Sequence, residues 1–238
     1  MIKTDDINIL AIETATSSCS VALSVGDLMF ERSEIGNNIH SQKLLSMIEA
    51  ILSESQINVS DLNAVAVGQG PGSFTGLRIG IGVAQGIAYG VNCKMLGISS
   101  LAALAQQALD KGYVIAGIDA RMNEVYWGAY KVSPTGVKLI GGLQLNPPQE
   151  INLEMISQLG LDLDNQELVF AGNAWSEYED IFQQSLFTEL KHTRDEALPQ
   201  AIGIIELAHR AYNQSEFIDP INFAPKYVRN NVAKKKAT

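Results

Sequence analysis

The sequence predicts a duplicated α/β fold with two lobes and a cleft between them. Short apolar runs alternate with longer amphipathic stretches, which is the pattern of strands interleaved with helices. The order of three strands, a helix, a strand and a helix occurs twice along the 238 residues. A chain of this length has room for two such units. We therefore predict a first lobe over residues 1–108 and a second over 109–211, with residues 212–233 packing back on the first.

The first half is predicted to begin with three strands, over residues 7–12, 20–25 and 28–33. Small and hydroxyl side chains fill the turn after the first strand, and Gly26-Asp27 is typical of a tight turn after the second. An amphipathic helix follows over residues 40–55, because its apolar residues recur at helical spacing. The rest of this half is predicted as a strand over 64–67, a helix over 73–90, a strand over 94–98 and a helix over 101–110.

The second half repeats this order of elements without repeating the residues themselves. Pro147-Pro148 is typical of a helix start and predicts one over residues 150–158. The other predicted elements are strands over 113–119, 124–132, 137–143 and 167–171, and helices over 174–184 and 197–210.

Composition and charge limit the classes of function. The 17 Lys and Arg residues against 26 Asp and Glu residues give a net charge of −9, which disfavours independent binding to nucleic acid. The two cysteines are far apart and lack CxxC spacing, which argues against a disulfide framework or a zinc site. No signal peptide or membrane-spanning run is evident, so we expect a cytoplasmic location and no membrane contact. Lys234-Lys235-Lys236 is interpreted as a solvated tail.

Glycine is concentrated in one stretch, where eight of the 20 glycines lie between Gly68 and Gly90. The stretch reads as a strand, a glycine-rich turn and a helix N-terminus, a combination that favours anions. It matches neither the Walker A loop nor the GxGxxG fingerprint, although residues 70–73 could form an anion-binding nest.

The same glycines also have a structural interpretation, which we favour. Gly72, Gly76 and Gly80 are spaced by four residues, as are Gly82, Gly86 and Gly90. On a helix this spacing leaves a broad bare strip against which another backbone can pack closely. A helix that tolerates several glycines needs such a reason, because each costs roughly 0.5–1 kcal/mol relative to alanine.

Two polar turns are candidate sites. The turn after the first strand could contact phosphate or magnesium through Glu13 and its hydroxyls, or could simply satisfy its own backbone. Residues 119–124 are interpreted as a solvated hairpin turn. The three histidines are scattered without HExxH or HxxxH spacing, so we assign no catalytic residue and no metal ligand. Candidates for a residual nucleotide or anion site are Glu13, Thr14, Thr16, Gly70, Gly72 and Ser73.

Five segments together resemble one protein family over nearly the whole chain. They are ILAIETATSSCSVAL, HSQKLL, GPGSFTGLRIG, IDARMNEVYW and APKYVRNNVA. This set is similar to the TsaB (YeaZ) family of bacterial tRNA threonylcarbamoyladenosine biosynthesis proteins. The resemblance implies the actin/hexokinase-like (ASKHA) fold, in agreement with the two βββαβα units.

The resemblance also implies a function. It suggests a non-catalytic, activating subunit that binds the catalytic relative TsaD and acts with the ATPase TsaE in threonylcarbamoyl transfer to tRNA. The chain lacks the HxxxH metal pair of TsaD-like proteins and has Glu13 where the family commonly has Asp. Any ATP or ADP with magnesium would then be held weakly and within the complex, and tRNA would be contacted indirectly.

The family further implies that the helices over residues 40–55 and 73–90 pair with TsaD in a four-helix interface. Because an apolar surface of this kind usually does not stay exposed, we expect the isolated chain to form a homodimer through it and to exchange that contact for TsaD. The expected interface residues are His40, Leu44, Leu45, Ile48, Gly72, Phe74, Thr75, Gly76, Ile79, Gly80 and Val83. Two alternatives stay open from the residues themselves. One is a stand-alone ATP-dependent phosphotransferase or peptidase, and the other is a chaperone-like regulator of the catalytic subunit.

Overall fold

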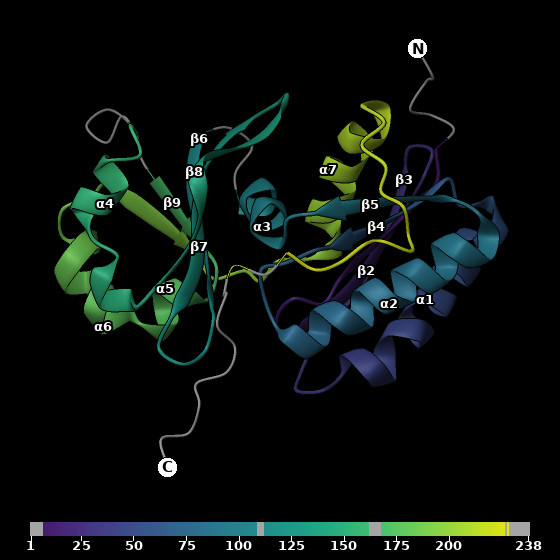
Figure 1. Cartoon of the computed structure of the whole chain (residues 1–238), viewed down its shortest axis with the longest axis horizontal. Coiled ribbons are helices and arrows are strands. Elements are labelled where there is room, and N and C mark those ends of the chain that lie inside the picture. Colours follow the sequence, from purple (N-terminus) through teal and green to yellow (C-terminus); the bar gives the residue numbers. More distant parts are fainter. Residues whose placement is uncertain (1–6, 109–111, 162–167, 227, 229–238) are drawn as a thin grey trace.

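A computed structural model describes residues 7–108, 112–161, 168–226 and 228, which form two five-stranded sheets side by side (Figure 1). The first sheet has the order β3-β2-β1-β4-β5, and the second, read from its far edge, has the order β8-β7-β6-β9-β10. The first comprises β1 (Ile9–Glu13), β2 (Ser18–Val25), β3 (Leu28–Ile35), β4 (Ala64–Gly68) and β5 (Lys94–Ile98). The second comprises β6 (Gly112–Asp119), β7 (Val125–Ser133), β8 (Gly136–Asn146), β9 (Leu168–Ala171) and β10 (His192–Asp195).

Strand directions show that the two halves share one topology. In the first sheet β1, β2 and β3 pair antiparallel, whereas β4 pairs parallel with β1 and with β5. In the second sheet β6, β7 and β8 pair antiparallel, whereas β9 pairs parallel with β6 and with β10. The predicted duplication and two-lobed α/β class are therefore confirmed.

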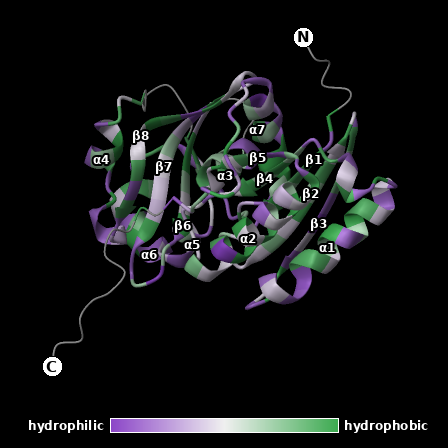
Figure 2. Cartoon of the chain, turned by 45° about the vertical axis from the view of Figure 1, so that its right-hand side comes forward, coloured by the Kyte–Doolittle hydropathy of each residue, from purple (hydrophilic) through white to green (hydrophobic). Residues whose placement is uncertain are grey.

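The helices are α1 (His40–Ser55), α2 (Phe74–Val91), α3 (Ser100–Ala108), α4 (Leu153–Ser157), α5 (Ala174–Glu177), α6 (Glu179–Phe182) and α7 (Ala201–Asn213). Helices α1 and α2 pack on one face of the first sheet, where Leu44, Ile51 and Leu77 join the core. Hydrophobic and hydrophilic residues alternate along α1, and the central strands are largely hydrophobic (Figure 2). Within the described residues no helix is long and apolar enough to cross a bilayer.

The last helix of each half packs on the sheet of the other half. Helix α7 covers the second face of the first sheet, where Ile204 and Ile205 share a core with Ile9. Helix α3 covers the second sheet, where Leu101 and Leu104 share another core with neighbouring strands. The two helices also contact each other, so they lie between the two sheets (Figure 1).

The C-terminal segment crosses the first half. Ile218 N donates to Met95 O at 2.9 Å, and Lys226 N donates to Gln69 O at 2.9 Å. Between these points Phe223 is buried in the core beneath α2. The lysines at 234–236 lie outside the described residues, as do residues 109–111 around the predicted lobe boundary.

Three elements of the second half differ most from expectation, and the helix predicted over 150–158 is shortened to α4. The helix predicted over 174–184 is interrupted at Tyr178, whose φ of −118° leaves the helical region, and residues 183–187 then form a wider π turn. The predicted helix over 197–210 starts later, at Ala201, because Pro199 disfavours helix before it. Strand β10 was missed, because its polar sequence HTRD carries no strand pattern.

Candidate functional site

A cavity of about 480 Å³ lies between the two halves. Four segments line most of it: the β1–β2 turn, the loop entering α1, the first turns of α2, and the β6–β7 loop; Tyr126 of β7 and Asn173 after β9 complete the lining. The polar side chains at these positions are mainly hydroxyls and amides. Asp119 and Arg121 are the charged residues among them.

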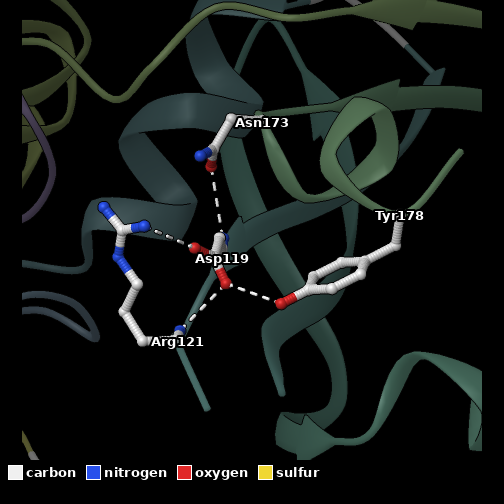
Figure 3. Close-up of polar contacts among 4 residues, drawn as sticks. All are labelled: Asp119, Arg121, Asn173 and Tyr178. Carbon is white, nitrogen blue, oxygen red and sulfur yellow. Dashed lines mark hydrogen bonds and ion pairs between the residues drawn. The ribbon is translucent and has the colours of Figure 1, made fainter. Parts of the chain in front are cut away.

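Asp119 anchors the β6–β7 loop through a set of polar contacts (Figure 3). Its Oδ1 accepts hydrogen bonds from the Tyr178 hydroxyl and from the Arg121 backbone N–H, both at 2.9 Å. Its Oδ2 lies 3.5 Å from Arg121 Nη1, and its own N–H donates to Asn173 Oδ1 at 3.2 Å. Burial, followed by the hydrogen bond to Asp119, raises the pKa of Tyr178 to about 12, so its hydroxyl remains a donor.

The loop itself has an uncommon backbone. Arg121, Met122 and Asn123 have φ values of 61°, 59° and 58°, so three successive non-glycine residues are left-handed. Each such residue costs of order 1 kcal/mol or more, and a cluster of them is typical of functional segments. The predicted hairpin turn is confirmed, and it presents Arg121, whose side chain is 82% exposed, toward the cavity.

Glu13 and Thr14, expected in a residual anion site, are instead fully buried beside the cavity. Glu13 Oε1 accepts from the N–H groups of Thr14 and Ala15 at 2.7 and 2.6 Å. Thr14 Oγ1 donates to Gly76 O at 2.9 Å. Burial raises the pKa of Glu13 to about 7, against the lowering effect of the Ser100 hydroxyl and the two amides. Glu13 therefore stabilises the backbone of the β1–β2 turn from the protein interior.

The other expected anion-site residues are divided. Thr16, Gly72 and Ser73 line the cavity, whereas Gly70 is buried behind it. Ser73 caps α2, because its Oγ accepts from Gly76 N at 3.2 Å. Its own N–H donates to Ala15 O at 2.6 Å, so this amide is already used within the chain. The predicted nest therefore has fewer amides to offer an anion than the sequence suggested.

The glycines of α2 fall into two groups with opposite surroundings. A Cβ at Gly76 would overlap the Thr14 carbonyl oxygen, and one at Gly80 would overlap Thr14 Oγ1. At Gly82, Gly86 and Gly90 nothing lies within 4 Å of an added Cβ. The predicted bare strip is therefore open only at the second group, whereas the first group packs against the chain's own β1–β2 turn.

The expected interface residues are similarly divided. Leu44, Ile48, Gly76 and Gly80 are buried within the chain's own core, as α1 and α2 must use one face against the sheet. His40 is 8% exposed, and its Nε2 lies 3.3 Å from Ser18 O. The half-buried residues are Gly72, Ile79 and Val83. The exposed residues are Leu45, Phe74 and Thr75, of which Leu45 is 60% exposed.

Sequence reasoning missed two polar residues of this site, Asn173 and Tyr178. Asn173 follows Gly172, whose φ of +109° permits the sharp turn after β9. A Gly-Asn pair directly after a buried strand was the available signal. Tyr178 had no such signal in the local sequence, because it contacts Asp119, which lies 59 residues earlier in the chain. No group of three metal-ligating side chains occurs among the described residues.

Two sheets of identical topology, with exchanged helices and a cavity between them, define a two-lobed protein of the actin/hexokinase-like (ASKHA) class. A family model described as "TsaD: tRNA N6-adenosine threonylcarbamoyltransferase" matches residues 34–237. Relatives that are 37% identical over nearly their full length show that the chain belongs to the TsaB (YeaZ) family.

Individual relatives match over nearly their full length. The tRNA threonylcarbamoyladenosine biosynthesis protein TsaB of Escherichia coli K12 is 37% identical, covering 97% of this chain and 98% of the relative. That of Haemophilus influenzae is also 37% identical, covering 97% of each chain. The solved structure of YeaZ from Pseudomonas aeruginosa is 34% identical and superimposes with a TM-score of 0.82, covering 93% of this chain and all of that one.

Proposed function

We propose that this chain is a non-catalytic, activating subunit in tRNA threonylcarbamoyladenosine biosynthesis. In this proposal it binds the catalytic subunit TsaD and acts with TsaE. The complex transfers a threonylcarbamoyl group from threonylcarbamoyl-AMP to N6 of the adenosine beside the anticodon, in tRNAs that read codons starting with A. Family membership supports the assignment to this pathway. The exposed apolar face of α2 is the observation that supports binding to a partner protein.

Helix α2 is unusually apolar for a surface helix. Arg78 is the one charged residue among its 18. Phe74, Arg78, Gly82, Gly86 and Gly90 are all exposed and form a single row at a spacing of four residues. The three glycines leave this row open, so the backbone of another helix can approach it closely.

The row is complementary to itself when two copies of α2 pack antiparallel. With a two-fold axis at Gly82, Phe74 of one copy faces Gly90 of the other, and Arg78 faces Gly86. Arg78 would then lie near the carboxyl end of the other α2, which has no basic residue in its own last turn. This pattern supports a homodimer that exchanges one copy for TsaD, the protein after which the matching family model is named.

Reconstitution tests the function. We expect threonylcarbamoyladenosine formation from TsaD, TsaE, tRNA and threonylcarbamoyl-AMP to depend on this chain. Equal product without it would contradict the proposal. ATP turnover by the purified chain alone would favour a stand-alone enzyme instead.

The surface is tested by Gly86→Leu, which fills the open row without touching the monomer core. We expect loss of the homodimer and of TsaD binding in light scattering, with unchanged monomer folding. Gly142→Leu is the matched control, because Gly142 is also open but lies in β8. Dimers and complexes that survive Gly86→Leu would place the interface elsewhere.

A further inference from the structure

The two sheets have four edge strands, and within the described residues only β3 forms a long, regular and exposed edge (Figure 2). Strand β5 is bridged by Ile218, whose N–H donates to Met95 O. Strand β10 has four residues, and β8 is interrupted by a register shift and by Gly141, whose φ is 71°. Covering, shortening and bulging keep strand edges from pairing with other chains. Strand β3 shows none of these devices, because its eight residues pair with β2 without a shift.

The charged side chains of β3 do little to block this edge. Arg32 Nη2 lies 2.6 Å from Glu54 Oε2 of α1. Glu34 Oε2 lies 3.3 Å from Lys43 Nζ, also of α1. Charges protect an edge strand when an incoming strand would leave them unbalanced. Here two of the three charged residues of β3 are already paired with the chain's own helix, on one face of the sheet.

The other face of β3 carries exposed apolar side chains. Met29 lies opposite Ser24 of β2, and the Ser24 hydroxyl lies 2.9 Å from Nε2 of His209, so Met29 belongs to the α7 face. Ile35 shares this face, because side chains alternate along a strand and six residues separate the two. Met29 is 44% exposed and Ile35 is 68% exposed. A further strand paired with β3 would cover both.

The sequence of β3 is complementary to itself in one antiparallel register. With a two-fold axis at Arg32, Met29 faces Ile35 of the second copy, and Glu31 faces Ser33. Residues opposite each other in this register point to the same face of the sheet. An axis at Glu31 would oppose two carboxylates, and an axis at Ser33 would oppose Ile35 with Glu31. The axis at Arg32 matches apolar with apolar, and each Arg32 keeps its ion pair with α1.

We infer that β3 is a self-pairing edge, at which the β3 strands of two copies pair antiparallel about Arg32 and join two five-stranded sheets into one. Main-chain hydrogen bonds supply the affinity, and the contacts between Met29 and Ile35 select the register. The inference goes beyond the proposed function, because helix α2 packs on β1, β4 and β5, and β2 separates β3 from these strands. We therefore expect this contact to form independently of the α2 surface.

Disulfide trapping in the full-length chain tests the pairing and its register. Only a residue on the axis faces its own copy, at a Cα distance of about 4.5–5.5 Å that a disulfide can span. Under mild oxidation, Arg32→Cys should form cross-linked dimers at least about tenfold faster than Ser33→Cys, whose two copies are offset along the strands. Ser33→Cys is the matched control, one residue along the same edge. The native chain, whose Cys19 is buried and Cys93 half-buried, gives the background rate.

Two further changes in the Arg32→Cys chain test what holds the copies together. Ile35→Lys should slow cross-linking about threefold or more, because it removes an apolar cross-strand contact on each side of the axis. Ile221→Lys is the control, since Ile221 is 73% exposed but lies on the C-terminal segment beside β5. Gly86→Leu should leave the cross-link unchanged, which separates this test from that of the α2 surface.

Three results would overturn the inference. They are equal cross-linking rates in Arg32→Cys and Ser33→Cys, a rate that Ile35→Lys does not lower, and loss of the cross-link with Gly86→Leu. All these positions are exposed, so the variants should keep the native far-UV circular dichroism spectrum. A chain without this contact could still activate TsaD, so failure here leaves the proposed function to its own reconstitution test.

Discussion

A single added methyl group should have opposite effects at two glycines of α2. At Gly76 the methyl overlaps the Thr14 carbonyl oxygen, so Gly76→Ala should destabilise the monomer by on the order of 1–3 kcal/mol. At Gly86 the space within the monomer is open, so Gly86→Ala should stabilise the dissociated monomer by about 0.5–1 kcal/mol through helix propensity. Thermal unfolding checks both, at about 2–4 °C per kcal/mol for a chain of this size. Equal effects at the two sites would contradict the described packing.

Glu13 should make stability depend on pH. Folding raises the pKa of its carboxyl from 4.5 to about 7, so the folded state holds the proton more tightly than the unfolded state. Its contribution is therefore most favourable below about pH 4.5, declines as the pH rises to about 7, and levels off above that. The full change is on the order of 3 kcal/mol.

Glu13→Gln should remove this dependence, because the amide keeps an acceptor for Thr14 and Ala15 and cannot ionise. Urea unfolding at several pH values between about 5 and 8 measures it. The stability of the variant relative to the native chain should increase with pH. Glu49→Gln, an exposed position on α1, controls for the loss of one acidic group. A constant difference between Glu13→Gln and the native chain would contradict the raised pKa.

At the scale of elements, local patterns predicted the first half well and the second half less well. Helix α1 and strand β5 have the predicted bounds, because strong apolar periodicity and clear turns define them. Strand β10 has no such pattern and forms because β9 offers a parallel edge. The helix break at Tyr178 coincides with tertiary packing. On its two sides Trp175, Phe182 and Phe187 form an aromatic cluster on the second sheet.

The site shows the same division between local and long-range information. Sequence spacing revealed a glycine strip on α2, but not which glycines face the chain's own β1–β2 turn. That distinction depends on contacts between residues some 60 positions apart, as in the hydrogen bond from Thr14 to Gly76. Likewise, the sequence did not reveal that Glu13 is fully buried, where one carboxylate oxygen accepts hydrogen bonds from the two backbone amides that follow it.

The crossing of α3 and α7 depends on a close approach at Gly203. A Cβ there would lie 2.5 Å from Ala103 O on α3. Gly203→Ala should therefore separate the two helices and destabilise the chain by about 1–3 kcal/mol, despite the better helix propensity of alanine. Chemical denaturation measures the change. Gly86→Ala, on an open helix surface, is the comparison, and stabilisation by both variants would contradict a tight crossing.

At the scale of the whole molecule, the exchange of α3 and α7 should join the two lobes into one cooperative unit. The first sheet buries Ile9 and Leu96 against a helix from the second half, and the second sheet buries Val114 against a helix from the first. Neither sheet can keep both faces covered if the other lobe unfolds. The exposed apolar area would make such a partly unfolded state unfavourable.

The two tryptophans provide a direct test of this coupling, because Trp127 and Trp175 both belong to the second half and are fully buried. Tryptophan fluorescence therefore follows the second lobe, whereas far-UV circular dichroism follows both. Gly76→Ala weakens only the first lobe, yet it should shift both transitions to lower denaturant by the same amount, with one midpoint shared by the two probes. If the lobes were independent, the fluorescence midpoint would stay at its native value and the circular dichroism curve would separate into two steps. The exchanged helices would then contribute packing without cooperativity, and the two halves would have to be treated as separate folding units.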